Sequence, residues 1–147
     1  MGFEFKLEAL RRYRHFKEEM LQKELAQMQR HRDREIALLA EMIDKRTMAE
    51  QDMIGEQEKR THGPRMALYE TYLNGLTQDI KNQRQRVKEA QALCSEKMNA
   101  LLKAVQERKS IEKLKEKGLK AYIEKLDRNE QKFLNEIAIN RFVRADN

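Results

Sequence analysis

The one proline of the chain, Pro64, follows Gly63 between two very long stretches of helix-forming sequence. Proline fits the first turn of a helix, where its missing N–H costs nothing, but it breaks a helix that would run through it. The sequence therefore predicts a helix over about residues 3–58, a turn near 55–64 bracketed by Gly55 and Gly63, and a helix over about 65–142. At a rise of about 1.5 Å per residue the arms measure about 87 Å and about 117 Å, so the second extends past the first.

The second arm carries the clearest apolar pattern. Alternating steps of three and four residues from Met66 to Ile111 meet apolar or aromatic side chains at eleven of fourteen positions. The series is Met66, Tyr69, Leu73, Leu76, Ile80, Gln83, Val87, Ala90, Cys94, Lys97, Leu101, Ala104, Arg108 and Ile111. A seam this regular predicts a supercoiled partner helix.

Beyond Ile111 the strict series meets Lys115 and Gly118, which are poor seam residues. An extra four-residue step restores an apolar series. Its members are Leu119, Tyr122, Leu126 and Phe133. The pattern predicts a stutter, a local unwinding of the supercoil.

The first arm has a similar but interrupted seam. Its apolar positions are Leu21, Leu25, Met28, Leu39, Met42, Ala49 and Met53, with interruptions at Arg32, Glu35 and Arg46. Nearer the start, one face carries Phe3, Leu7, Leu10 and Tyr13. Antiparallel pairing about the turn should place Met42 near Gln83, Met28 near Cys94 and Phe3 near Lys120. These patterns predict an all-α chain in which residues 1–147 form a single long antiparallel two-helix coiled-coil hairpin with an overhanging C-terminal helix end.

The overhang has no predicted partner within the chain from about Leu126 onward. It is rich in apolar residues: Leu126, Phe133, Leu134, Ile137, Ala138, Ile139, Phe142 and Val143. Burying one such side chain is worth roughly 1.5–3 kcal/mol, so we expect the group to be covered. Another protein binds there, the tail folds back, or two chains pair.

The net charge of +6 is unevenly distributed. The first sixty residues hold equal numbers of basic and acidic side chains, so the surplus lies on the second arm, most densely from Lys81 to Lys120. This stretch is either a footprint for nucleic acid or an acidic protein, or the solvated flank of a coiled coil, since glutamates interleave the bases. One cysteine, no secretory signal and no long apolar run predict a cytoplasmic protein without a membrane span.

No residue pattern indicates catalysis. His15, His31 and His62 are too widely separated on a rod to converge on a metal ion. Cys94 occupies a seam position, where a thiol behaves as a small hydrophobe. No glycine-rich loop is present to hold a phosphate, and a two-helix rod offers no pocket that excludes water. We expect a protein that is not an enzyme and uses no cofactor or metal.

The chain resembles the FliJ family of flagellar export proteins over essentially its full length, and three stretches carry the resemblance. They are Phe3–Arg14 (FEFKLEALRRYR), the aromatic and apolar positions Tyr69, Tyr72, Leu73, Leu76 and Ile80, and Glu130–Phe142 (EQKFLNEIAINRF). The resemblance implies a non-enzymatic coiled-coil stalk of flagellum biogenesis and motility, similar to the rotor stalk of rotary ATPases. The resemblance also implies a place in the cytoplasm, peripherally associated with the inner membrane at the flagellar base.

The implied partners are the hexameric flagellar export ATPase, the cytoplasmic region of the export gate, and export chaperones; no nucleic acid is expected. The implied ATPase-facing residues are Phe3, Phe5, Leu7, Leu10, Phe133, Leu134, Ile137, Ile139, Arg141 and Phe142. The implied gate-facing residues are Met42, Tyr72, Leu76 and Gln83. The apolar overhang and the family's ring-binding end coincide, although the overhang follows from helix lengths alone.

Three alternatives stay open. The equivalent stalk of a virulence type III secretion system has the same architecture, although the phenylalanine-rich ends favour the flagellar version. A homo-oligomeric scaffold would pair its overhangs. A nucleic-acid-binding coiled coil would use the basic stretch and bind with a steep salt dependence, although no stacking aromatic interleaves those bases.

Overall fold

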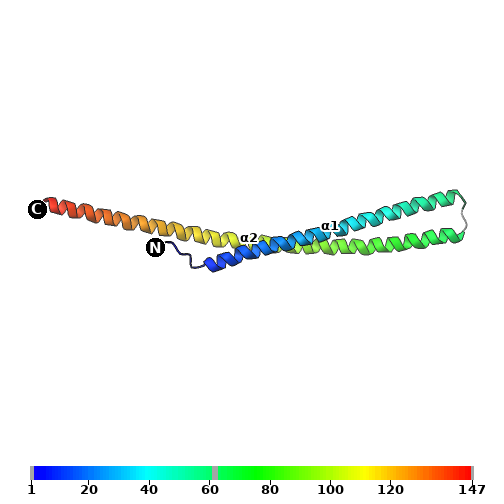
Figure 1. Ribbon diagram of the computed structural model, residues 1–147, viewed down its shortest axis with the longest axis horizontal. Coiled ribbons are helices and arrows are strands. Elements are labelled where there is room, and N and C mark those ends of the chain that lie inside the picture. The colour runs from blue at the N-terminus through cyan, green and yellow to red at the C-terminus, as the bar shows by residue number, and fades with distance from the viewer. Residues whose placement is uncertain (1, 61–62, 147) are drawn as a thin grey trace. The chain divides into compact units, whose positions relative to one another are not determined.

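The computed structural model describes residues 2–60 and 63–146. These ranges form two α-helices and no strand: α1, Glu8–Glu58, and α2, Gly63–Asp146. The two helices pack against each other and run antiparallel (Figure 1). The prediction of an all-α helical hairpin is confirmed.

The chain divides into two units, each containing part of both helices. The turn unit is Met20–Leu102, and the end unit is Met1–Glu19 with Lys103–Asn147. Apolar residues line the seam in each unit because they recur at alternating steps of three and four, the spacing that keeps one helix face toward a supercoiled partner.

The predicted seam of α2 is confirmed. Every position of the series from Met66 to Ile111 is buried or half-buried, and Ile80 and Ile111 are each only 1 % exposed. On α1 the seam includes three charged positions that we expected to interrupt it. Arg32, Glu35 and Arg46 are all half-buried.

The polar seam positions of α2 each meet a glutamate of α1. In the turn unit, Gln83 donates hydrogen bonds from its side-chain amide to the Glu35 carbonyl oxygen, at 2.9 Å, and to the Glu35 carboxylate. Lys97 Nζ lies 2.9 Å from a carboxylate oxygen of Glu24. In the end unit, Arg108 pairs with Glu18. These pairs give each partly buried polar side chain a hydrogen-bond or ionic partner, and burial without one would destabilise the fold.

Polar pairs of this kind also fix which residues face each other along a coiled coil. The observed register is close to the predicted one: Met42 and Gln83 line the same hollow, although the direct hydrogen-bond partner of Gln83 is Glu35.

The helices extend further into the predicted turn than expected, and one described residue there that is not a glycine is left-handed. Helix α1 continues through Gly55 and ends at Glu58, and Arg60 takes the left-handed conformation with φ 56°. The Arg60 N–H donates to the Gln57 carbonyl at 3.0 Å, which satisfies one of the free carbonyls at the helix end. Pro64 lies in the first turn of α2, as predicted.

Helix α1 begins at Glu8 rather than near residue 3. The Glu8 N–H donates to the Phe5 carbonyl at 3.1 Å, and the acidic side chain of Glu8 suits the positive end of the helix dipole. Residues 2–5 precede the helix without regular structure. As a result Phe3, Leu7 and Leu10 do not form one helical face.

Candidate functional site

The base of the overhang lies in the end unit, where the N-terminal segment meets α2. The Phe3 ring packs against Tyr122 with centroids 5.7 Å apart and planes tilted by 44°. It also lies over Gly118, where an added Cβ would approach the Phe3 Cζ to 3.2 Å. The small residue therefore provides the space that the ring fills.

The predicted stutter is wrong for this structure. Lys115, Gly118 and Tyr122 continue the seam in half-buried positions, whereas Leu119 is 41 % exposed. The physical reason is the Phe3 ring, which supplies beside Gly118 the apolar volume that the glycine lacks. Nothing in the spacing of α2 alone reveals this contact.

The N-terminal candidates of the end unit differ in accessibility, and two of them line an open hollow. Phe3 and Phe5 are half-buried and line it together with Glu8 and Lys115. Leu7 and Leu10 are 41 % and 37 % exposed. Of these candidates the two leucines present the most accessible apolar surface.

A network of charged side chains ties α1 to α2 in the end unit. Glu8 binds Arg11 at 2.6 Å and Lys115 at 3.4 Å. Glu112 lies 2.5 Å from His15 Nε2 and 3.2 Å from Arg11. Sequence reasoning missed this network because its members become neighbours only once the register is known.

The network shifts the pKa values of its acidic groups. Hydrogen bonds from Arg11 lower the pKa of Glu8 from 4.5 to about 2, with Lys115 adding to the effect. The hydrogen bond with His15, followed by that from Arg11, lowers the pKa of Glu112. Both carboxylates are therefore held in the charged form, the form that binds the cations of the opposite helix.

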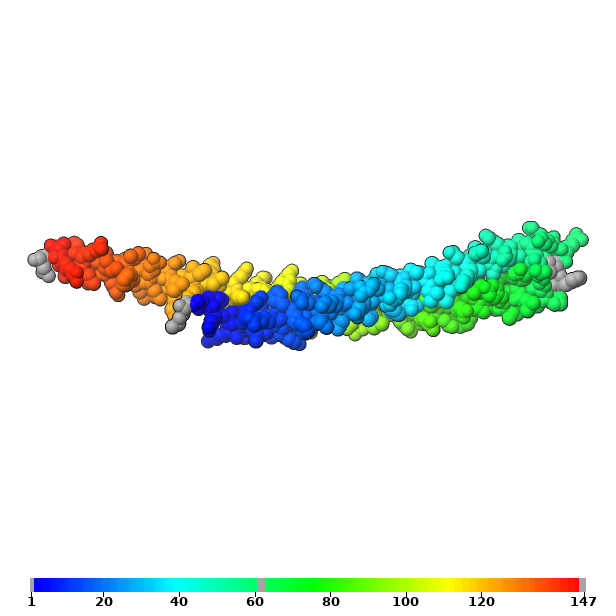
Figure 2. Space-filling model, viewed as in Figure 1, coloured from blue at the N-terminus to red at the C-terminus, as the bar shows by residue number. Residues whose placement is uncertain are grey.

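The overhang of α2 has no other helix against it in the end unit. Figure 2 shows the orange-to-red end of α2 bare, with the blue N-terminal segment at its base. From Ile123 to Ala145 every residue is exposed except Ile137, which is half-buried. Phe133, Ile139 and Phe142 are 61 %, 60 % and 69 % exposed. The predicted uncovered tail is confirmed over the described residues.

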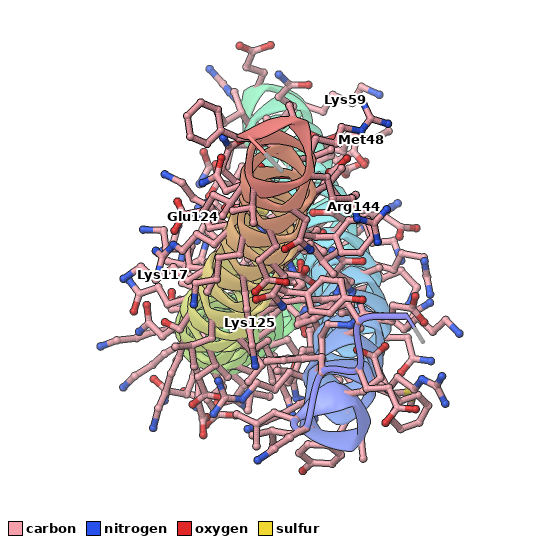
Figure 3. All side chains as sticks on the ribbon, turned by 90° about the vertical axis from the view of Figure 1, so that its left-hand side faces the viewer. Met48, Lys59, Lys117, Glu124, Lys125 and Arg144 are labelled. Atoms are coloured by element: carbon pink, nitrogen blue, oxygen red, sulfur yellow. The ribbon has the colours of Figure 1, made fainter. Side chains whose placement is uncertain are left out.

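The apolar strip of the overhang faces a different direction from the seam. Leu119, Leu126 and Phe133 recur every seven residues, and each stands one position after a residue of the seam register. Since successive helical residues are turned by about 100°, the strip is turned by that angle from the seam. Residues that are seven apart on this part of α2 lie on the same side of the helix, as Figure 3 shows for Lys117 and Glu124. A partner on the strip would therefore not continue the line of α1.

The last turns of α2 are apolar on more than one side. Phe133 and Ile137 belong to the strip, whereas Ile139, Phe142 and Val143 point to other sides of the helix at about 100° per residue. Glu136 and Asn140 leave one side of these turns polar. The end of α2 therefore exposes apolar side chains in several directions rather than along a single strip.

The gate-facing candidates lie in the turn unit and differ in accessibility. Met42 is half-buried and shares a hollow with Asp79 and Gln83, and Gln83 itself is 1 % exposed. Leu76 is half-buried in the seam. Tyr72 is 53 % exposed and lines a groove with Arg65 and Leu68.

Other chemistry-bearing residues form no site in the described part of the chain. Cys94 is buried at 7 % exposure, as its seam position predicted. No group of three or more His, Cys, Asp or Glu side chains is placed to hold a metal ion within residues 2–60 and 63–146. His62 lies outside these described residues. No described helix combines the length and apolar character needed to cross a membrane.

Comparison with known proteins identifies the family. No curated protein and no solved structure matches the chain. The family model described as flagellar FliJ protein matches residues 3–147, which is nearly the entire length. The chain therefore belongs to the FliJ family and is a component of the flagellar protein export apparatus.

Proposed function

We propose that the chain is a non-catalytic stalk that inserts the overhang of α2 into the hexameric ATPase of the flagellar export apparatus. The observation that carries this proposal is the exposed end of α2, apolar on several sides over residues 133–143. A ring encloses a central helix from all sides, so it offers apolar contacts to Phe133 and Phe142 at once. A binding face on one side would need only a single strip.

The stalk acts by binding rather than by chemistry. Contacts that favour the assembled, nucleotide-competent ring over its separate subunits shift the population toward that state. Phe3, Phe5, Leu7 and Leu10 add to the same surface at the base of the overhang. Arg141 contributes a cation at the tip that suits an acidic pore.

The turn unit is proposed to contact the export gate at the cytoplasmic side of the membrane, and chaperones that deliver substrates. Tyr72 offers the most accessible side chain of the gate candidates, with 53 % of its surface exposed. Met42 and Leu76, both half-buried, add a smaller apolar surface elsewhere in the same unit. Gln83 acts indirectly, since its amide is held by Glu35.

The test is ATP hydrolysis by the purified export ATPase, alone and with four forms of the chain. They are the full chain, a chain ending at residue 123, Leu134→Ser and Leu102→Ser. The two leucines are a matched pair on α2, because they are 52 % and 54 % exposed. We expect stimulation and ring binding by the full chain and by Leu102→Ser. Stimulation should be weaker with Leu134→Ser and lost on truncation.

Equal stimulation by the truncated and full chains would exclude the overhang as the binding element. If no form binds the ring or changes the rate, the stalk proposal is wrong. A stable dimer that dissociates on truncation would then favour a homo-oligomeric scaffold.

A further inference from the structure

One flank of the helix pair in the turn unit combines exposed apolar and basic side chains. Its apolar part is Ile36, Ala40 and Ile43 of α1, which recur at i, i+4 and i+7 and so form a stripe along the helix. Ile36 is 40 % exposed, Ala40 is exposed and Ile43 is half-buried. With three basic residues of α2 this stripe makes up the Ile36 face: Ile36, Ala40, Ile43, Lys81, Arg84 and Lys88.

The register places the basic residues beside the stripe. Gln83 bonds to Glu35 across the seam, and Ile36 and Arg84 are the residues that directly follow this pair. In an antiparallel pair, residues that follow opposed seam positions lie on the same flank. Gln29 and Met98 show this in the same unit, since each follows a seam residue and both line one hollow.

The three cations on this face are available to a ligand. Lys81, Arg84 and Lys88 are exposed, and none of them forms an ion pair within the part of the chain that the structure describes. The nearby acid on this flank, Asp33, is engaged by Arg32 at 2.9 Å. The Ile36 face therefore carries uncompensated positive charge beside an apolar stripe.

The opposite flank of the turn unit provides a contrast. It holds Leu38, which is 38 % exposed, but its charges are mixed in sign. The charged residues of that flank over the same stretch are Arg34, Glu41, Lys45, Asp79, Arg86 and Glu89. The positive charge is thus specific to the Ile36 face.

We propose that the Ile36 face binds an acidic amphipathic α-helix of a partner protein. A partner helix with apolar residues at three- and four-residue spacing fits the Ile36–Ile43 stripe, the helix-in-groove mode of recognition. Acidic residues flanking its apolar side would meet Lys81, Arg84 and Lys88, which favours fast association and selects against basic partners. The Ile36 face contains no residue of the overhang, so binding at this face is independent of ATPase binding.

The experiment uses fluorescence anisotropy with a labelled synthetic peptide of about three helical heptads. The peptide has leucine at i, i+4 and i+7 positions and glutamate on both flanks. The control peptide has the same composition with the leucine spacing scrambled. We expect the full chain to bind the first peptide more tightly than the second, with affinity falling as salt rises.

Two pairs of matched variants locate the site. Ile36→Ser and Leu38→Ser alter residues of nearly equal exposure on opposite flanks. Arg84→Glu and Arg86→Glu alter two exposed arginines on opposite flanks. Ile36→Ser and Arg84→Glu should each weaken peptide binding by about tenfold, whereas their counterparts should change it by less than about twofold. Thermal unfolding followed by circular dichroism checks that all four variants fold.

Equal weakening by both members of each pair would overturn the proposal, as would equal binding of the scrambled peptide. A single-stranded DNA probe of similar length tests the other reading of the basic stretch. A nucleic-acid surface would be identified instead by DNA binding that is tighter than peptide binding. In that case Arg84→Glu and Arg86→Glu should weaken DNA binding equally, and Ile36→Ser should leave it unchanged.

Discussion

Ile111 and Phe133 lie on the same helix and in the same unit, yet Ile111 is 1 % exposed and Phe133 is 61 % exposed. Ile111 belongs to a seam that α1 covers, and Phe133 belongs to a strip turned by about 100° from it. The comparison shows that α2 carries two separate apolar patterns. One is buried between the two helices of the hairpin, and the other is exposed.

Alanine substitutions at these two positions test the comparison most directly. Ile111→Ala should lower the free energy of unfolding by about 2–5 kcal/mol, because it removes buried methyl groups and leaves a cavity. Phe133→Ala should change it by less than about 0.5 kcal/mol, because the side chain is already in water. Urea denaturation followed by circular dichroism measures both. A similar loss in the two variants would mean that the overhang is covered by the chain itself.

A smaller effect is expected for the polar part of the seam in the end unit. Arg108→Ala leaves the Glu18 carboxylate, 13 % exposed, without its cation and should cost about 1–3 kcal/mol. The double variant Arg108→Leu with Glu18→Leu should restore or exceed the original stability, because apolar residues can replace an ion pair of this kind. Urea denaturation of Arg108→Leu, Glu18→Leu and the double variant gives the coupling energy. An additive double variant would show that the pair does not interact.

The smallest effect is the acid dependence of the end unit. The pKa of Glu8 is about 2 in the folded chain and 4.5 when unperturbed, so its stabilising contribution is complete above pH 4.5. That contribution is lost as the pH falls toward 2, and Glu112 acts in the same direction. Urea midpoints between these pH values should fall less steeply in Glu8→Gln than in the unaltered chain. Parallel curves would mean that the Glu8 carboxylate does not stabilise the pairing.

Helix type, turn position and the α2 seam could be predicted because they depend on local spacing. Pro64 locates the break, and the three-and-four series from Met66 to Ile111 needs only side-chain polarity to be read. The start of α1 could not be predicted in this way. Residues 2–5 have helix-compatible composition, but Phe3 gains more by packing on Gly118 and Tyr122 than by extending a helix end.

The candidate site was predictable only in part. The apolar overhang follows from unequal arm lengths, and its exposure is confirmed at Phe133 and Phe142. The ion network of Glu8, Arg11 and Glu112 depends on register, which polar seam residues set through partners distant in sequence. In the sequence, charged positions such as Glu35 therefore look like interruptions of the apolar seam. In the structure they make polar contacts with the opposite helix.

The Arg108–Glu18 pair also sets the length of helix that remains free. If α1 were displaced by one heptad toward the turn, Arg11 would stand opposite Arg108, and two like charges would meet at the seam. Phe3 would lose Gly118, and two more turns of α2 would be bare. The ion pair therefore selects, among the possible heptad registers, the one that leaves this length of α2 free.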